Sequence, residues 1–363
     1  MRISTIVAGG LALLASTAPV LAEEAAVSAS VSANASMSAP AALDPDQYFK
    51  GQTGGTFGKS VTDVLLPKSK RVAVAGFRVV FMSENNISAQ VRASYLPGRD
   101  SSGAKASMKV VLEGVDQAAM QAVTDKAYAA FLAQLAASGR EVVPASELAS
   151  FHAEMEASAQ PYSKEVNGQK GIALAPTGMP LFFTYADPGW TDKNAFNQKS
   201  YRMLAPLSEK LQAIVIAPLI VVDFAKLSSS GNRSGLMARD AEVGAELGMA
   251  VNTFWTPMIR AEESRSGMTS KGEEANASML QGIHSDVAYG TMAKLEESDN
   301  KGVKGVADML GGFMGMANAG GAARSKSTQV AKTDGAAYST AALDALGRST
   351  GTFAAWFQKY PAN

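Results

Sequence analysis

Two carboxylates and one aromatic side chain are the residues of this chain best suited to bind a ligand. Asp223 lies near the end of the most apolar run of the sequence, IVIAPLIVVDF, where a buried carboxylate needs a hydrogen-bonding partner or a raised pKa. The segment Asp187-Pro-Gly-Trp190 joins a carboxylate to an aromatic platform, although these residues are also typical of a turn. Asp187, Trp190 and Asp223 are therefore candidate ligand-binding residues, with a purely structural role as the alternative for each.

The residue types that usually carry catalysis or bind metals are scarce. The 363 residues include no cysteine and 2 histidines, which excludes disulfides, thiolate zinc sites and cysteine nucleophiles. Two Ser-x-x-Lys matches, Ser102–Lys105 and Ser298–Lys301, lie in polar segments, whereas that chemistry needs the serine at the start of a buried helix. His152 and His284, the latter two residues before Asp286, could each act as a general base, but are interpreted as ordinary polar residues. We predict no catalytic residue, no metal and no cofactor, and these features favour a protein that is not an enzyme.

Charge and the first residues indicate where the protein works. Lys and Arg together number 33, as do Asp and Glu, so the basic excess of a nucleic-acid-binding protein is missing. Arg2, an apolar run over 6–18 and the small-x-small sequence at 20–22 are typical of a cleavable secretion signal. No later apolar run reaches the roughly 18 residues that a membrane-spanning helix needs. We therefore predict a periplasmic or secreted protein with no nucleic-acid partner.

Strands and helices follow one another along the chain and must position the candidate residues. Asp116 as an N-cap and Gly139 after the last turn bound the clearest helix, and Ser146 is the predicted N-cap of the next one. We predict strands at 71–82, 105–115, 140–143, 213–227, 241–262 and 277–295, an edge strand or extended arm at 172–186, helices at 116–138, 146–157, 201–212 and 340–360, and a polar loop at 320–335. The predicted fold class is α+β: a mixed or antiparallel sheet with helices packed mainly on one face, plus a long antiparallel strand meander.

The predicted domain organisation has three parts. Residues 1–22 form the signal peptide, and 23–60 form a flexible leader because Ala, Ser and Gly there show no apolar periodicity. Residues 61–363 form a single α+β domain with a Gly-rich insertion near 300–337.

The long strand at 241–262 and the strand at 277–295 alternate apolar and polar side chains with period two. Such strands suit a sheet that carries helices on one face. They also suit a transmembrane β-hairpin, whose lipid-facing side is apolar. We favour the soluble sheet, so membrane contact is the less favoured interpretation.

The order of these elements resembles a known family. RVAVAGF, the helix from Asp116 to Ser138, GREVV followed by SELASF, then IVIAPLIVVDF and the long alternating strand are similar to the domain shared by the curli secretion channel, the TolB amino-terminal domain and related envelope lipoproteins. The resemblance covers about residues 70–262 and the last helix. It implies a non-enzymatic periplasmic module that oligomerises or docks onto partners and, in the curli channel, inserts hairpins into the outer membrane. This chain has no cysteine to carry a lipid and no counterpart for 187–200, so no functional residue is carried over.

Together these features predict a non-enzymatic exported cell-envelope protein that acts as an interaction or assembly module. Its partners would be other envelope proteins or further copies of itself. The first alternative is a carboxylate-based hydrolase or small-ligand-binding protein with its site around Asp223 or 187–190. The second alternative is an oligomeric outer-membrane secretion pore.

Overall fold

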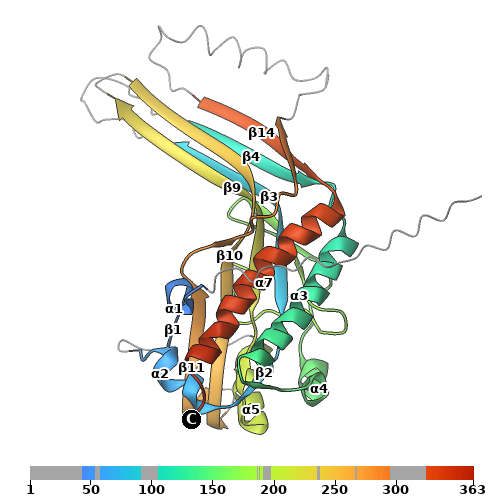
Figure 1. Ribbon diagram of the computed structural model, residues 1–363, viewed down its shortest axis with the longest axis vertical. Coiled ribbons are helices and arrows are strands. Elements are labelled where there is room, and N and C mark those ends of the chain that lie inside the picture. The colour runs from blue at the N-terminus through green and yellow to red at the C-terminus, as the bar shows by residue number, and fades with distance from the viewer. Residues whose placement is uncertain are drawn as a thin grey trace, which may run out of the picture. The chain divides into compact units, whose positions relative to one another are not determined.

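A mixed sheet forms the centre of the protein, and helices pack against it (Figure 1). The structure is a computed structural model that describes residues 43–53, 58–90, 105–185, 187, 189–190, 198–234, 238–265, 268–294 and 324–363. Within these residues the helices are α1 (Pro45–Tyr48), α2 (Val61–Val64), the 3-10 helix η1 (Leu66–Lys68), α3 (Gln117–Ala137), α4 (Ala145–Glu154), α5 (Lys199–Leu211) and α7 (Gly335–Lys359). The strands are β1 (Phe49–Thr53), β2 (Arg71–Val74), β3 (Arg78–Gln90), β4 (Lys105–Glu113), β5 (Glu141–Val142), β6 (Tyr162–Val166), β7 (Gln169–Leu174), β8 (Ile214–Ile216), β9 (Leu219–Ser234), β10 (Ala238–Arg265), β11 (Met268–Met279), β12 (Ile283–His284), β13 (Gly290–Lys294) and β14 (Arg324–Thr333).

The sheet combines parallel and antiparallel pairs. In the described residues its 14 strands follow the order β13-β14-β4-β3-β9-β10-β8-β2-β5, while β1, β6, β7, β11 and β12 pair beside this path. Strands β9, β10 and β11 run antiparallel in succession, and β2 lies parallel to both β5 and β8. The predicted α+β class with a mixed sheet is therefore confirmed.

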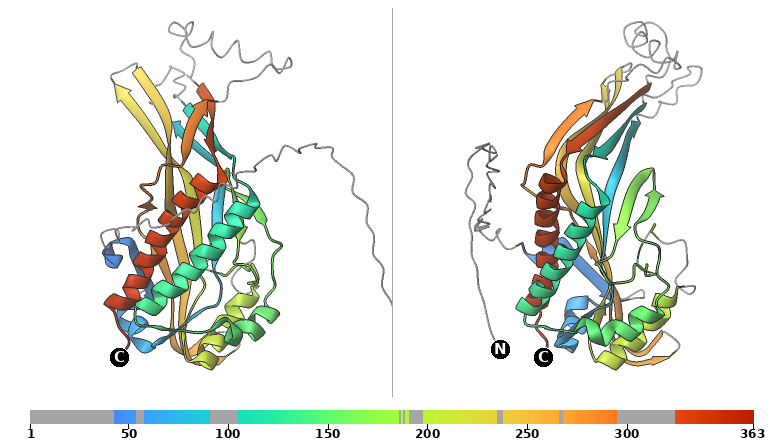
Figure 2. Two further views of the ribbon diagram at one scale, coloured as in Figure 1. Left: turned by 45° about the vertical axis from the view of Figure 1, so that its right-hand side comes forward. Right: turned by 90° about the vertical axis from the view of Figure 1, so that its right-hand side faces the viewer.

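Helices α3 and α7 lie side by side on one face of the sheet (Figures 1 and 2). Phe254 of β10 stacks on Phe353 of α7 with ring centroids 4.7 Å apart, and Phe49 of β1 meets both rings edge-on. On the other face, α4 and α5 pack with β8 in a second, smaller apolar cluster (Figure 2). Alternate residues of β8 belong to this smaller cluster and to the main apolar cluster under α3 and α7, because successive side chains of a strand point to opposite faces.

The boundaries of α3 follow from its sequence. The Asp116 carboxylate accepts a hydrogen bond from the Ala119 amide at 2.8 Å, which satisfies one of the free N–H groups of the first turn. The buried face of the helix recurs every three or four residues, from Met120 to Leu135. Gly139 follows with a φ of 85°, a conformation that glycine adopts without strain. The predicted helix at 116–138 is confirmed.

The sheet divides where β3 and β9 part, and we call this place the fork. The two strands pair in parallel only from Arg78 to Phe81 and from Leu219 to Val222. Beyond the fork, β9 pairs only with β10 among the described residues, while β3 pairs with β7 and β4, and β14 and β13 follow β4 in the sheet. Figure 1 shows both groups of strands extending past the ends of α3 and α7.

Two predicted strands are each divided in two. The strand predicted at 71–82 is interrupted between β2 and β3, where a Cβ on Gly76 would lie 2.9 Å from the Phe182 ring. The strand predicted at 213–227 is interrupted between β8 and β9 by Pro218, which has no N–H to donate to a ladder. The two interruptions lie together, since the Arg78 amide donates to the Pro218 carbonyl at 3.0 Å.

Other predicted elements are displaced. The strand predicted at 277–295 is wrong as a single element, because its described residues are divided among the end of β11, β12 and β13. Between β12 and β13 the Ser285 hydroxyl accepts a hydrogen bond from the Val287 amide. The polar loop predicted at 320–335 is also wrong, since residues 324–333 form β14, which pairs in parallel with β4. The arm predicted at 172–186 is a strand only up to Leu174, where β7 ends.

The start of the fold and of α4 also differ from expectation. The N-cap of α4 is Pro144, and Ser146 lies inside the helix. The flexible leader is predicted to reach residue 60, but folded structure begins at Pro45. Both α1 and β1 lie before residue 60, and Phe49 is buried. The signal peptide at 1–22 and most of the Gly-rich insertion near 300–337 lie outside the described residues.

Candidate functional site

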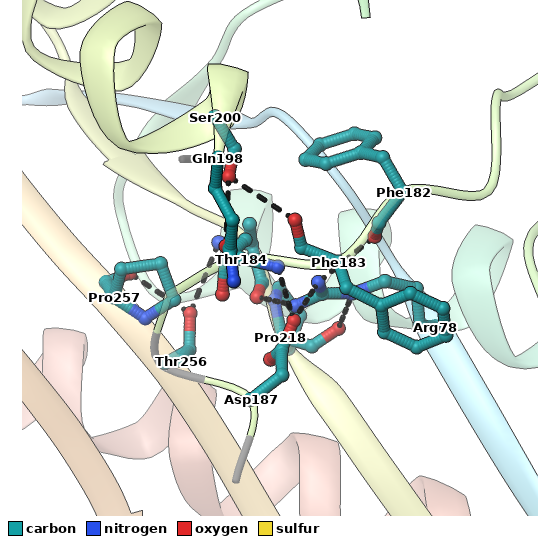
Figure 3. A network of polar contacts seen from close by, with 11 residues as sticks. Arg78, Phe182, Phe183, Thr184, Asp187, Gln198, Ser200, Pro218, Thr256 and Pro257 are labelled. Carbon is teal, nitrogen blue, oxygen red and sulfur yellow. Dashed lines mark hydrogen bonds and ion pairs between the residues drawn. The ribbon is translucent and has the colours of Figure 1, made fainter. Parts of the chain in front are cut away.

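Asp187 is held by an arginine inside the protein (Figure 3). Its Oδ2 atom lies 2.5 Å from Nη1 of Arg78, and their side chains are 0% and 1% exposed, respectively. The Thr184 amide donates to the same carboxylate oxygen. The guanidinium also donates to three backbone carbonyls, those of Phe182, Ala217 and Pro218. The pair therefore ties the segment around Asp187 to the start of β3 and to the turn before β9.

Burial governs the ionisation of both partners. Burial raises the pKa of Asp187, and the charge of Arg78 together with the hydrogen bonds from Thr184 acts against that increase. Burial likewise lowers the pKa of Arg78 against the attraction of Asp187. The two opposite charges compensate each other, and Asp187 is fully buried although its Oδ1 atom has no hydrogen-bond partner among the described residues, so this carboxylate offers little to a ligand from outside. Of the two roles considered from the sequence, this geometry favours the structural one.

Trp190 and Asp187 contact different parts of the protein. Its side chain is 6% exposed and packs over β7, where a Cβ on Gly171 would lie 2.6 Å from the indole ring. Trp190 also lines a cavity of about 200 Å³, whose other lining residues are Met155, Glu156, Ser158, Tyr162, Phe182, Phe183, Gln198, Lys199 and Ser200. Asp187 is not among these lining residues, so the two residues that the sequence proposes as one ligand loop do not share this cavity.

Asp223 lies at the fork and lines the larger of these two cavities. That cavity measures about 310 Å³ and is lined by Asn85, Gln169, Asp223, Ala225, Lys226, Leu227, Gly248, Ala250, Asn252 and His284. Oδ2 of Asp223 accepts a hydrogen bond from Asn252 at 2.8 Å, and Oδ1 accepts one from Asn85 at 3.4 Å. Both donors are neutral amides, in contrast to the guanidinium that meets Asp187.

The surroundings of Asp223 disfavour its ionised form. Burial raises the pKa of this carboxyl group, and the hydrogen bonds from Asn252 and Asn85 offset part of the increase. Two tyrosines lie near it: the Tyr289 hydroxyl donates to the Phe224 carbonyl, and the Tyr338 ring packs edge-on against Tyr289. Burial raises the pKa of both tyrosines, and the Asp223 charge adds to that shift. Both hydroxyls are therefore protonated and uncharged, so neither tyrosine provides a counter-ion for Asp223.

The remaining sequence candidates form no catalytic arrangement among the described residues. His152 bonds through Nε2 to the Ala75 carbonyl at 2.9 Å, and burial lowers its pKa. The Asp286 carboxylate lies 2.8 Å from the Arg348 guanidinium, and His284 instead lines the cavity at the fork. Ser102 and Ser298 lie outside the described residues.

The residues that sequence reasoning missed are the amides around Asp223. Asn85 sits within β3 and is 1% exposed, although asparagine is uncommon in strands. Asn252 occupies an irregular position of β10, between Val251 and Thr253, where the pairing with β9 shifts. No local signal identifies Asn85, because residues 83–90 of β3 are mostly polar and its burial depends on the packing around the strand.

Fold and site together define an α+β protein with a divided mixed sheet and a polar cavity at the division. Within the described residues there is no group of three or more His, Cys, Asp or Glu side chains arranged to hold a metal ion. None of the described helices combines the length and apolar character needed to cross a membrane. Comparisons with protein-family models, with curated protein sequences and with solved structures find no match.

Proposed function

We propose that this protein is a non-enzymatic, exported module of the cell envelope that binds other envelope proteins or further copies of itself. The observation that carries the proposal is the pairing beyond the fork. Among the described residues, 225–234 of β9 and 238–247 of β10 pair only with each other. We call these two segments the hairpin arm. Free strand edges present unpaired N–H and C=O groups, which are a template for pairing with another chain.

The side chains of the hairpin arm support the same proposal. Val243, Ala245 and Leu247 are only partly buried on one side of β10, while Glu242 and Glu246 are exposed on the other. A partner laid along the apolar side would remove that surface from water, which favours association at about 25 cal/mol per Å². A two-stranded ribbon is marginally stable alone in water, so it also gains from a partner.

The proposed location rests on the sequence. Arg2, the apolar run at 6–18 and the small residues at 20–22 are typical of a secretion signal. A periplasmic or secreted protein would meet partners of the envelope.

Photo-crosslinking in exporting cells tests the proposal. We expect a photoreactive phenylalanine derivative at Val243 to give a discrete protein adduct, whose mass equals two chains for self-association or another sum for a second protein. The same group at Gln358, exposed on α7, is the control and should give none. Equal labelling at both positions, or adducts at Val243 with lipid alone, would reject the proposal, and the lipid result would favour the membrane alternative.

A further inference from the structure

The cavity at the fork arises from interruptions of strand pairing. Beyond Phe81 and Val222, β3 and β9 no longer pair with each other. On β10 the register shifts between Leu247 and Ala250, the residue that lies opposite Asp223. Such bulges bend a strand and re-aim its side chains, and they are frequent beside functional sites. The irregularities surround one cavity of about 310 Å³, large enough for a small molecule.

The cavity holds an excess of hydrogen-bond acceptors. Each oxygen of Asp223 accepts one amide N–H, although a carboxylate can accept about four hydrogen bonds. Asn85 is 1% exposed and lines the cavity, and its Oδ1 atom has no hydrogen-bond partner among the described residues. A buried acceptor without a donor is costly, so the cavity is complementary to a ligand that brings N–H groups.

The protein itself supplies little positive charge to Asp223. Among the described residues no lysine, arginine or histidine nitrogen forms an ion pair with this carboxylate. Lys226 and His284 line the cavity but are exposed, and Tyr289 and Tyr338 are neutral. A cation brought into the cavity would therefore stabilise the ionised form of Asp223.

An organic ammonium group fits this cavity better than a metal ion. Ca²⁺ takes about six to eight oxygen ligands, usually from several carboxylates, whereas Asp223 is the only carboxylate among the residues that line the cavity. A primary ammonium carries one charge and three N–H donors, which match the Asp223 carboxylate and the Asn85 Oδ1 atom. Ala225, Leu227 and Ala250 add apolar contacts for a short carbon chain.

We propose that the cavity at the fork binds small primary amines, with Asp223 as counter-ion to the ammonium group and Asn85 Oδ1 as a further acceptor. The cavity shares Ala225, Lys226 and Leu227 with the base of the hairpin arm, but amine titration and crosslinking at Val243 have separate readouts, so either proposal can fail without the other.

Titration of the exported chain with n-butylammonium, followed by calorimetry and ligand-observed NMR, tests this site. Butan-1-ol has the same number of heavy atoms without the charge, and tetramethylammonium has the charge without an N–H donor. We expect n-butylammonium to bind at least tenfold more tightly than either. Equal binding of butan-1-ol would mean an apolar cavity only, and tighter binding of Ca²⁺ would mean a metal site. Either result, or no binding of n-butylammonium, overturns the proposal.

Three variants locate the binding. Asp223→Asn keeps the side-chain shape and should lower the affinity at least tenfold, while Leu227→Trp should do so by filling the cavity without touching the carboxylate. Asp125→Asn is the matched control, because Asp125 also accepts amide hydrogen bonds, from Gln121 at 3.0 Å and Thr177 at 2.7 Å, but does not line the cavity. Its affinity should equal that of the wild type. Undiminished binding by a folded Asp223→Asn or Leu227→Trp variant, with melting temperatures verifying the fold, contradicts the assignment.

Discussion

Asp187 is fully buried and Asp223 is half-buried, and the two carboxylates differ in the groups that meet them. Asp187 contacts the Arg78 guanidinium at 2.5 Å, whereas Asp223 is met by the neutral amides of Asn85 and Asn252. A buried charge with an internal counter-ion is satisfied, while one held by amides alone still attracts a cation. Two aspartates that look alike in the sequence thus serve different purposes, and their partners decide which.

The two sites occupy opposite ends of the short stretch where β3 and β9 pair. Arg78 begins that stretch and faces Leu219, and Asp223 follows directly after its last pair. Where the strands are joined, the turn carbonyls and Asp187 surround the arginine, whose side chain is 1% exposed (Figure 3). Where the strands separate, space opens beside the second carboxylate. Strand pairing at one end and strand divergence at the other account for the closed and the open site.

Arg78→Met should have the largest effect of the changes considered. It leaves the Asp187 charge buried without its counter-ion, which typically costs about 3–5 kcal/mol of unfolding free energy. Urea denaturation followed by circular dichroism measures this loss.

An exposed ion pair provides the control for Arg78. Lys109 lies 2.5 Å from Glu84, and both side chains are partly exposed. Lys109→Met should therefore cost less than about 1 kcal/mol. A similar loss in both variants would mean that burial adds nothing to the Arg78–Asp187 pair, and the contrast between the two aspartates would lose its basis.

Asn85→Ala should have an intermediate effect. The change removes one of the two side-chain donors to Asp223 and leaves that half-buried carboxylate less satisfied, at a cost of about 1–3 kcal/mol. Asn276→Ala, at an exposed position of β11, should stay within about 0.5 kcal/mol of the wild type. Equal melting temperatures for the two variants would show that Asn85 does not support Asp223.

Local signals made part of the fold predictable. Asp116 and Gly139 set the ends of α3 through interactions within a few residues, so the helix could be predicted from them. The hairpin of β6 and β7 was missed although Asn167-Gly168, both with positive φ, is a strong two-residue turn signal. Strand β14 has a different cause: most of its residues are polar, and it forms through its parallel pairing with β4, which lies far away in the sequence.

The candidate site was predictable only in its central residue. Asp223 is conspicuous because it interrupts an apolar run. Its donors come from β3 and from β10, and the cavity exists because two strands separate after Val222. These relations depend on how distant segments are arranged, and no local pattern encodes them. The same limit applies to Asp187, whose partner Arg78 lies on β3, far away in the sequence.

The smallest predicted effect is a pH dependence that distinguishes Asp223 from an ordinary surface carboxylate. Burial raises the pKa of Asp223 in the folded state above its ordinary value of 3.8, despite the hydrogen bonds from Asn252 and Asn85. Between these two pKa values the folded state holds the proton more tightly than the unfolded state, so this group's contribution to stability is present below the ordinary value and is lost as the pH rises. Asn does not titrate, so Asp223→Asn should gain stability relative to the wild type as the pH increases through that window. At Asp125 the hydrogen bonds from Thr177 and Gln121 outweigh burial and lower the pKa. Asp125→Asn should therefore lose stability relative to the wild type as the pH rises toward the ordinary value of 3.8. Urea unfolding of both variants across pH 3 to 8 should give slopes of opposite sign, and slopes of the same sign would show that Asp223 is not a carboxylate disfavoured by burial.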